Sequence, residues 1–342
     1  MEKTSCVFLC GDRSAYGMAH LEAIAEHFDL RAVLIADDRR WKIFSDRLSG
    51  GETQTAQRRS VRSVVRNLAR QPIVALRAYR HRQRLRKTTL IECHDANTPE
   101  TVQRVGEIQP QVLLSAAYPQ ILRKEILKIA PRGAVNFHPS ALPLFRGAHP
   151  HYWSLATGAD TGGVTAHYMT TQIDSGDIIA QQTFSLQGLY YADLYSKIIE
   201  ETPALVEAVA RFFDNPNAKG TPQDEALATT FRGEREIHRR LDFSTMSGRD
   251  LVNRIRAGRA FAYHREQKIE IDRAQLADED RPVPHDASAL PGTIVDIREE
   301  NIVVATIDGS HLLIERLIRD GQPLSPGRWA ARERVNVGES LQ

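Results

Sequence analysis

The sequence predicts an α/β protein with a mostly parallel, twisted N-terminal sheet and a smaller C-terminal domain built as a β-barrel. The first observation is the opening pattern, in which apolar runs at residues 7–10 and 31–37 flank an amphipathic segment at residues 17–28. The second is a change after residue 231, where short apolar runs separated by turn residues replace the strand–helix alternation. A chain of 342 residues is also long enough for two domains.

The individual elements follow from hydrophobic periodicity and from helix and turn signals. Residues 192–213 place apolar side chains along one helical stripe, and the Pro- and Asn-containing run 214–222 ends that helix. In the N-terminal part we expect helices over residues 17–28, 98–108, 122–129 and 192–213, and strands over residues 7–10, 31–37, 111–115, 133–137, 163–169 and 178–184. In the C-terminal part we expect a helix over residues 247–257, strands over residues 268–271, 292–297, 302–307 and 311–316, and a loop over residues 278–291.

Composition excludes several classes of protein. The chain is 42% hydrophobic and 26% charged, and its mean hydropathy of −0.38 is that of a globular protein. No apolar run reaches the roughly 18 residues that a membrane-spanning helix needs, and the first residues hold too short an apolar stretch for a signal peptide. Three cysteines, Cys6, Cys10 and Cys93, follow no metal-ligand spacing. We therefore expect a cytoplasmic protein.

The charge is distributed unevenly along the chain. The formal net charge is only +2, yet residues 39–88 hold fifteen Lys or Arg and two acids, which gives this segment +13 and the remainder −11. We expect two basic helices here, over residues 58–70 and 74–87. Such a segment either attracts a polyanion, such as RNA, nucleotide phosphates or an anionic membrane surface, or is a solvated face whose arginines pair with acids elsewhere.

One ordered set of polar residues carries a chemical signal. Asn136 and His138 lie two residues apart at the carboxyl end of a predicted strand, so both side chains project from one face. Ligands of open α/β sheets bind at that edge. A Pro-rich loop ending at Gly147 follows, and the later loop 174–177 supplies Asp174, which could reach the imidazole. The bland alternative is a pair of turn-stabilising residues, with Asp174 and Asp177 each capping a turn.

An amide, an imidazole and a carboxylate together suit acyl transfer without a covalent intermediate. The Asn136 amide would donate to a carbonyl oxygen that becomes an oxyanion, and the His138 imidazole would donate a second hydrogen bond or a proton. The Asp174 carboxylate would orient the imidazole and help to remove a proton from the attacking amine. No serine or cysteine has the sequence context of a nucleophile. We expect His167 to be a packed strand residue, and Tyr152 and Trp153 to belong to the core.

At these residues the chain resembles the 10-formyltetrahydrofolate-dependent formyltransferases, in the branch that holds methionyl-tRNA formyltransferase and the sugar N-formyltransferases. The family pattern runs Asn-x-His-x-Ser-x-Leu-Pro, Arg-Gly, Gly-x-Thr-x-His and Asp-x-Gly. Residues 136–143, 146–147, 163–167 and 174–176 reproduce it in order. The resemblance covers residues 5–37 and 90–210 well and residues 232–338 more weakly. It implies a Rossmann-like catalytic domain and an OB-like C-terminal barrel.

The resemblance also implies which residues act. Asn136, His138 and Asp174 would be the catalytic residues, and 10-formyltetrahydrofolate would be the formyl donor, with no metal. The donor-binding residues would be Pro119, Gln120, Ile121, Leu122, Ser140, Pro143, Thr170, Thr171, Gln172 and Ile173. The domains would be residues 1–213, with the Arg-rich insertion at 39–88, a linker at 214–231 and a C-terminal domain at 232–342.

The acceptor amine stays open at this point. The Arg-rich insertion is longer than the short basic insertion of the methionyl-tRNA enzyme, and guanidinium groups suit RNA phosphates. The sequence at residues 148–153 and 257–262 differs from that of the methionyl-tRNA enzyme. This difference favours a smaller amine, such as a nucleotide-linked amino sugar or an amino-acid-derived metabolite. The arginines would then clamp phosphates, form a lid or make a homodimer interface. Three further alternatives are a formyltetrahydrofolate hydrolase, a non-catalytic folate- or RNA-binding protein, and a metal-dependent hydrolase.

Overall fold

The computed structural model describes residues 2–11, 15–36, 88–277 and 289–342. The predicted basic helices and nearly all of the Arg-rich insertion lie outside these residues, as does most of the predicted loop 278–291. The contacts divide the chain into two compact units. Unit 1 comprises residues 1–146, 163–183 and 197–230, and unit 2 comprises residues 147–162, 184–196 and 231–342.

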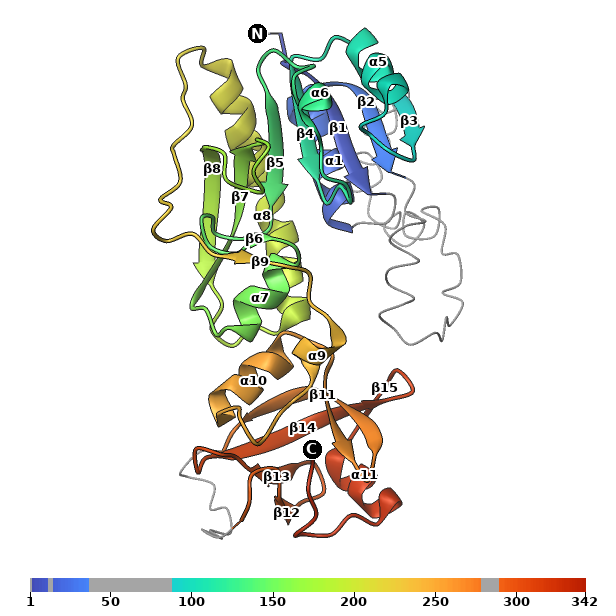
Figure 1. The fold of residues 1–342 in the computed structure, drawn as a ribbon, viewed down its shortest axis with the longest axis vertical. Coiled ribbons are helices and arrows are strands. Elements are labelled where there is room, and N and C mark those ends of the chain that lie inside the picture. The colour runs from blue at the N-terminus through green and yellow to red at the C-terminus, as the bar shows by residue number, and fades with distance from the viewer. Residues whose placement is uncertain (1, 12–14, 37–87, 278–288) are drawn as a thin grey trace, which may run out of the picture. The chain divides into compact units, whose positions relative to one another are not determined.

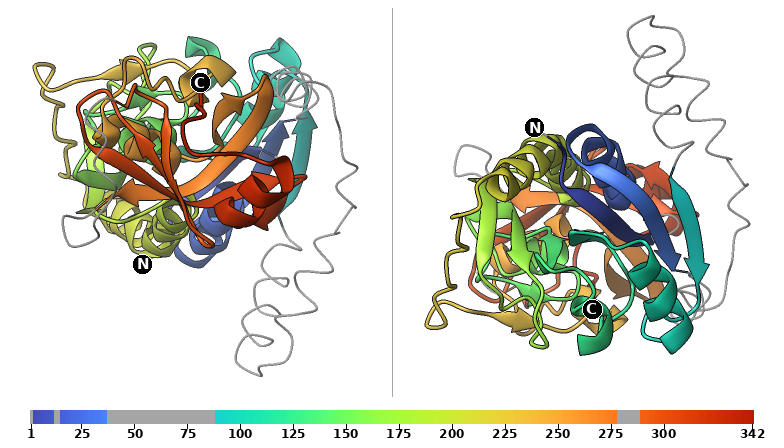
Figure 2. Two further views of the ribbon diagram at one scale, coloured as in Figure 1. Left: turned by 90° about the horizontal axis from the view of Figure 1, so that it is seen from below. Right: turned by 90° about the horizontal axis from the view of Figure 1, so that it is seen from above.

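Unit 1 is built on a seven-stranded sheet in the order β3-β2-β1-β4-β5-β7-β8 (Figure 1). Its strands are β1 (Ser5–Gly11), β2 (Asp29–Ala36), β3 (Thr89–Cys93), β4 (Val112–Ala116), β5 (Ala134–His138), β7 (Thr161–Tyr168) and β8 (Ile178–Ser185). Strands β1 to β5 pair with one another in parallel, and β7 runs antiparallel to β5. Figure 2 shows β1, β2 and β3 lying side by side and pointing the same way. The sheet is therefore mixed and mostly parallel, as the sequence predicts.

Apolar side chains on both faces of the central strands explain why helices cover them. Val7 and Leu9 share a buried cluster with Val105 of α5 (Pro99–Glu107) and Ile126 of α6 (Lys124–Leu127). Among the described residues, α1 (Ala15–His27) joins β1 to β2, and α8 (Tyr191–Asp214) follows β8. Thr98 begins α5, because its hydroxyl accepts a hydrogen bond from the Thr101 N–H.

Unit 2 contains an antiparallel sheet in the order β10-β11-β14-β13-β12, with β15 paired to β14. Its strands are β10 (Ala260–His264), β11 (Gln267–Leu276), β12 (Ile294–Ile297), β13 (Ile302–Ala305), β14 (His311–Arg319) and β15 (Gln322–Leu324). Its helices are α7 (Pro150–Ala156), α9 (Glu236–Arg239), α10 (Gly248–Arg256) and α11 (Pro326–Glu333). Buried Leu251, Ile271, Ile314 and Trp329 belong to one core. The predicted change from α/β alternation to short antiparallel strands is confirmed, and closure of these strands into a barrel stays a prediction.

Several elements escape the sequence analysis. Strands β3 and β10 and helices α7 and α11 were not among the expected elements, and the short β6 (Arg146–Gly147) and β9 (Thr230–Phe231) pair with each other. The helix expected over residues 122–129 is one turn, over Lys124–Leu127. None of the helices among the described residues is long and apolar enough to span a membrane.

Candidate active site

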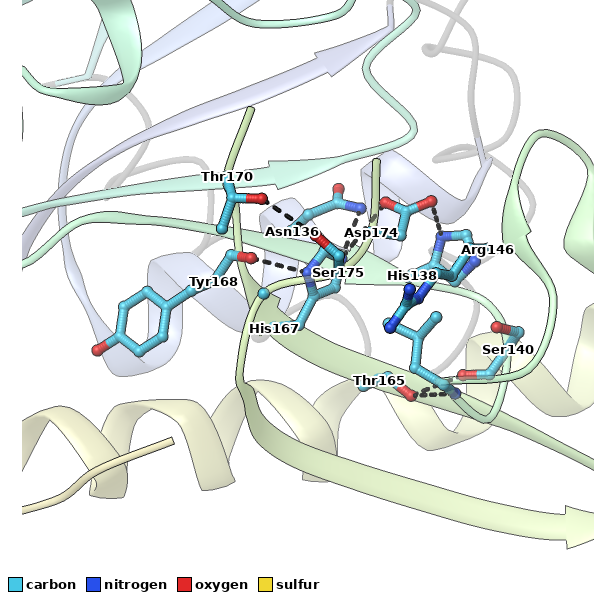
Figure 3. Close-up of polar contacts among 12 residues, drawn as sticks. Asn136, His138, Ser140, Arg146, Thr165, His167, Tyr168, Thr170, Asp174 and Ser175 are labelled. Carbon is cyan, nitrogen blue, oxygen red and sulfur yellow. Dashed lines mark hydrogen bonds and ion pairs between the residues drawn. The ribbon is translucent and has the colours of Figure 1, made fainter. Parts of the chain in front are cut away.

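Strand β5 carries Asn136 and His138 into the interior of unit 1. It pairs with β4 on one side and with β7 on the other, and Asn136 lies opposite His167 of β7. Residues two apart on a strand share a face, so Asn136 and His138 point to the same side of the sheet (Figure 3). The His138 side chain is only 5% exposed, so every polar atom of its ring needs a partner within the protein.

His138 lies between two acceptor oxygens. Its Nε2 is 2.9 Å from the backbone oxygen of Phe145, and its Nδ1 is 3.5 Å from Asp174 Oδ2. A carbonyl oxygen can only accept, so Nε2 carries a hydrogen that it donates to Phe145. Nδ1 therefore faces the Asp174 carboxylate, and a proton that binds there is held between the imidazole and the carboxylate.

The Asp174 loop reaches back over the sheet because Gly176 lies against β7. A side chain at Gly176 would overlap the backbone oxygen of Tyr168, so this position of the Asp-x-Gly motif has no room for a Cβ atom. The Tyr168 N–H donates to the Asp177 oxygen at 2.9 Å, which closes the loop. Asp174 adopts a φ of 49°, in the left-handed region that a residue with a side chain enters at a cost of about 1–3 kcal/mol. A residue stays in this conformation only where contacts with the surrounding structure stabilise the loop by more than this free energy.

His167 fixes the orientation of the Asn136 amide. Its Nδ1 lies 2.9 Å from the backbone oxygen of Tyr168 and donates to it, which leaves Nε2 as an acceptor. Asn136 Nδ2 lies 3.4 Å from that Nε2, so the amide nitrogen is held toward His167 and retains a second hydrogen for another acceptor. The same Nε2 is 3.5 Å from Asp174 Oδ1, a contact that is attractive only with a protonated ring, because a neutral Nε2 and a carboxylate oxygen are both acceptors. His167 is buried, as expected, and it also contacts two of the three predicted catalytic residues.

Burial dominates the electrostatics of the imidazole. Desolvation lowers the pKa of His138 below its ordinary value of 6.5, and the Asp174 carboxylate opposes this by favouring the charged ring. The neighbouring His167 lowers the pKa further, and the hydrogen bond to Phe145 raises it. The ring is therefore neutral near pH 7 but is flanked by two acceptors that stabilise an added proton. The arrangement can take up a proton and release it to a neighbouring atom.

The spacing of the Gly-x-Thr-x-His motif is explained by its packing on β7. Gly163, Thr165 and His167 alternate along β7 and so share one face. A Cβ at Gly163 would lie 2.6 Å from the Gln182 oxygen, and Thr165 Oγ1 donates to the Ser140 oxygen at 2.7 Å. The motif thus packs the loop that follows β5 onto β7.

The predicted donor-binding residues after β4 form an anchored loop. Gln120 Nε2 donates to the His94 oxygen at 2.7 Å, and Gln120 Oε1 accepts from the Ala96 N–H at 2.8 Å. The side chain of Ile121 is 73% exposed, whereas Leu122 is buried. The hydrogen bonds of Gln120 thus anchor this loop, and Ile121 stands in solvent.

Of the predicted donor-binding residues after β7, Thr170, Thr171 and Gln172 line a cavity of about 490 Å³, and Ile173 does not. Its lining comprises Tyr168, Thr170, Thr171, Gln172, Ser175, Gly176 and Asp177. Thr170 Oγ1 lies 3.2 Å from Ser175 Oγ and donates to the Gln172 oxygen at 3.0 Å, so hydrogen bonds within the loop shape it (Figure 3). Ile173 is 53% exposed. The volume is in the range of small-molecule sites.

Ser140 and Pro143 belong to the turn that follows β5. Ser140 is buried, and its hydroxyl donates to the Leu144 oxygen at 2.8 Å, so it stabilises the turn. The Pro143 oxygen accepts a hydrogen bond from the Thr229 N–H. The Ser140 hydroxyl and the Pro143 carbonyl thus both have hydrogen-bond partners within the protein.

Sequence reasoning missed several residues of this site. His167 could have been found from its place in the motif, because the alternation that packs it also aims it at β5. The Phe145 carbonyl and the side chains of Gln223 and Thr229 left no signal, because backbone acceptors and long-range amide contacts follow no local pattern. Gln223 reaches the Asp174 loop from 49 residues away.

Comparisons with known proteins bear on the family of the chain. Residues 53–208 match the family described as Formyl transferase, and residues 235–334 match the family described as Formyl transferase, C-terminal domain. The methionyl-tRNA formyltransferase of Acetivibrio thermocellus is 27% identical over 249 residues, which cover 71% of this chain and 78% of that protein.

Two solved structures share the fold. The N-formyltransferase from Helicobacter canadensis, in complex with folinic acid and dTDP-3-aminofucose, superposes with a TM-score of 0.57 at 17% identity, over 92% of this chain and 99% of that one. HypX from Aquifex aeolicus, in complex with tetrahydrofolic acid, gives 0.58 at 16% identity, over 99% of this chain. The chain spans about half the length of HypX, 49%. The first family match lies in the part of the chain with the mixed sheet, and the second lies in the part with the antiparallel sheet. Because the two matches together span most of the chain, the chain belongs to the formyl transferase family and is a formyltransferase.

Proposed function

We propose that the protein is an N-formyltransferase that moves a formyl group from 10-formyltetrahydrofolate to a primary amine of a small molecule. The observation that carries the proposal is the convergence of Asn136, His138 and Asp174. The Asp174 carboxylate lies 3.5 Å from the nearest nitrogens of both His138 and His167, and Asn136 lies 3.4 Å from His167. The three predicted catalytic side chains therefore meet at one place although the last lies 38 positions after the first in the sequence.

The residues suit direct attack by the amine. The amine nitrogen bonds to the formyl carbon, and the carbonyl oxygen becomes an oxyanion that accepts the second hydrogen of the Asn136 amide. The proton that the amine loses is taken up between Asp174 and His138 and is passed to N10 of the folate. The bond between the carbon and N10 then breaks, which leaves a formamide and tetrahydrofolate. One oxyanion donor of this kind is worth about 2.7–4 kcal/mol in the transition state.

The donor assignment rests on the site and on the relatives. The exposed side chains of Ile121 and Ile173 offer apolar surface on the two predicted donor-binding segments. The Helicobacter canadensis enzyme holds folinic acid and HypX holds tetrahydrofolic acid. We propose that the same class of ligand binds here, against the loops after β4 and β7.

For the acceptor we propose a nucleotide-linked amino sugar or an amino-acid-derived metabolite. The Helicobacter canadensis enzyme holds such a sugar, dTDP-3-aminofucose. The second candidate is the methionyl group of initiator tRNA. It is favoured by the 27% identical relative and by the +13 charge of residues 39–88, because basic segments bind nucleic acid phosphates.

A transfer assay tests the reaction itself. Purified protein is incubated with 10-formyltetrahydrofolate and a panel of amines, and the formylated product is identified by mass spectrometry. We expect turnover that falls about 100- to 1,000-fold in Asn136→Ala, because one oxyanion donor is lost. Formation of formate without any formylated amine would instead identify a hydrolase, and wild-type turnover in the variant would refute the role of the amide.

Salt dependence separates the two acceptors. A tRNA acceptor neutralised by several arginines loses affinity steeply as salt rises, whereas a small amine responds weakly. We expect a nucleotide-linked amino sugar to be formylated with a KM that changes less than about tenfold between about 50 and 200 mM salt. Turnover of charged initiator tRNA alone, with a steep dependence, would overturn the small-molecule proposal.

A further inference from the structure

The chain between the helix α8 and the strand β9 returns to the active site. The sequence predicts a linker over residues 214–231, yet Gln223 of this segment contacts the Asp174 loop directly. Gln223 Nε2 donates to the backbone oxygens of Asp174 and Gly176, at 2.8 Å each. Both hydrogens of the amide are thus used to hold the loop that carries the carboxylate.

Arg146 fixes which way the Gln223 amide points. Its Nε and Nη2 donate to Gln223 Oε1 at 3.1 and 2.9 Å. Two guanidinium donors require an oxygen at that place, so the amide nitrogen must face the Asp174 loop. Arg146 is itself 6% exposed and pairs with both carboxylate oxygens of Glu225, at 2.8 and 2.9 Å. Glu225 therefore holds the Arg146 guanidinium, which in turn orients the amide of Gln223 in the same segment.

Thr229 of this segment holds the other acceptor of His138. Its Oγ1 accepts a hydrogen bond from the Phe145 N–H at 2.9 Å, and its backbone oxygen accepts from the Arg146 N–H at 2.8 Å. Phe145 has a φ of 62°, in the left-handed region, and its carbonyl accepts from His138 Nε2. The turn thus presents its carbonyl to the imidazole while its N–H is held by Thr229.

We infer that Gln223 and Thr229 are positioning residues, which hold the two acceptors on either side of His138. Gln223 holds the Asp174 loop, and Thr229 holds the turn of Phe145. Asp174 and Phe145 both occupy backbone conformations that cost about 1–3 kcal/mol, and such conformations persist only where surrounding contacts over-determine them. The inference rests on the proposed function, because it assumes that Asp174 and His138 handle the proton.

Two variants and two matched controls test the inference. Gln223→Leu keeps the size of the side chain and removes both donors, and Thr229→Val removes the hydroxyl. Thr229→Ser keeps the hydroxyl, and Asp224→Ala alters the next residue, an exposed one whose carboxylate caps only its own turn at Ala226. We expect kcat to fall about 10- to 100-fold in the first two, with KM for the folate within about threefold, because small displacements of reacting groups cost rate. The two controls retain wild-type kcat.

The pH profile of kcat distinguishes positioning from general loss of structure. The titratable groups that face His138 are Asp174 and His167. A displaced Asp174 no longer raises the pKa of His138. The limb of the kcat profile that follows the titration of His138 therefore moves to lower pH in Gln223→Leu. Loss of folded protein would lower kcat at every pH without moving the limb.

The outcomes separate this inference from the proposed function. If Asp174→Asn is inactive while Gln223→Leu keeps wild-type kcat and an unmoved limb, the positioning role is wrong and the mechanism stands. If Asp174→Asn itself is fully active, the proposed mechanism fails whatever the linker variants do. If Gln223→Leu fails to fold, as judged by circular dichroism, Gln223→Glu replaces it. That variant keeps the acceptor for Arg146 but sets an oxygen against the two loop carbonyls, and wild-type kcat there would overturn the inference.

Discussion

Asp174→Asn is the change that probes the active site most directly. Asp174 is the single anionic group that contacts both His138 and His167 among the described residues. The substitution keeps the size of the side chain and removes the charge. The new amide can donate a hydrogen bond to His138 Nδ1, which stabilises the neutral ring and leaves no place for the amine's proton.

The distance between the two groups sets the expected loss. At 3.5 Å and an effective dielectric constant of about 20, a carboxylate and an imidazolium attract each other by about 5 kcal/mol. Both side chains are largely buried, at 5% and 14% exposure, so solvent screens the pair weakly. Since about 1.4 kcal/mol corresponds to a tenfold change in rate, the full attraction is worth about three and a half powers of ten. The amide recovers part of it, and we expect kcat to fall by at least about a hundredfold.

Steady-state formyl transfer, measured from about pH 5 to pH 9, checks this expectation. Loss of the carboxylate removes the interaction that raises the pKa of His138, while the burial that lowers it remains. The limb that reports His138 therefore moves to lower pH in any residual activity. A kcat within about threefold of wild type, with an unmoved limb, would refute the assignment of the proton to this pair.

The remaining predictions concern two other positions. Gly176→Ala should lower kcat at least about tenfold, because the added methyl overlaps the Tyr168 oxygen and displaces the loop. Gly106→Ala is its control, since nothing lies within 4 Å of the added atom, and it should stabilise the fold by about 0.5–1 kcal/mol in chemical denaturation without changing kcat. His20 is fully buried, and desolvation lowers its pKa to about 4 from 6.5. Below about pH 6.5 the unfolded chain binds a proton that the folded chain does not, so the stability that His20 contributes is present above that pH and is lost as pH falls toward 4. His20→Phe should reduce the pH dependence of the unfolding free energy over this interval by up to about 3 kcal/mol, and an unchanged dependence would contradict the cause.

Much of the fold follows from local patterns. The apolar run at residues 7–10 and the amphipathic segment at 17–28 become β1 and α1, and residues 192–213 become α8 within two residues at each end. These elements are long or strongly periodic, so their sequence alone selects them. Helix α7 was missed because its sequence Pro-His-Tyr-Trp-Ser-Leu-Ala has no clear apolar stripe. Strand β3 was missed because its alternation is short and follows a dense run of arginines.

The direction of β7 could not be derived from its own residues. Its apolar run fits a parallel or an antiparallel strand equally well, and pairing with β5 decides between them. That pairing sets His167 opposite Asn136, which makes it part of the site. The predicted linker is a similar case, because no sequence pattern within residues 214–231 predicts that Gln223 and Thr229 contact the loops around His138.

The sequence by itself determined the ordered motif that supplies an amide, an imidazole and a carboxylate, and the α/β framework followed by short antiparallel strands. Only the tertiary structure decided how those groups are held. Hydrogen bonds in which Phe145, His167, Gln223 and Thr229 take part hold the imidazole of His138, the amide of Gln223 and the left-handed turns at Phe145 and Asp174. The physical reason is that motifs are set by side-chain type over short distances, whereas buried donors and acceptors find their partners wherever the folded chain brings them.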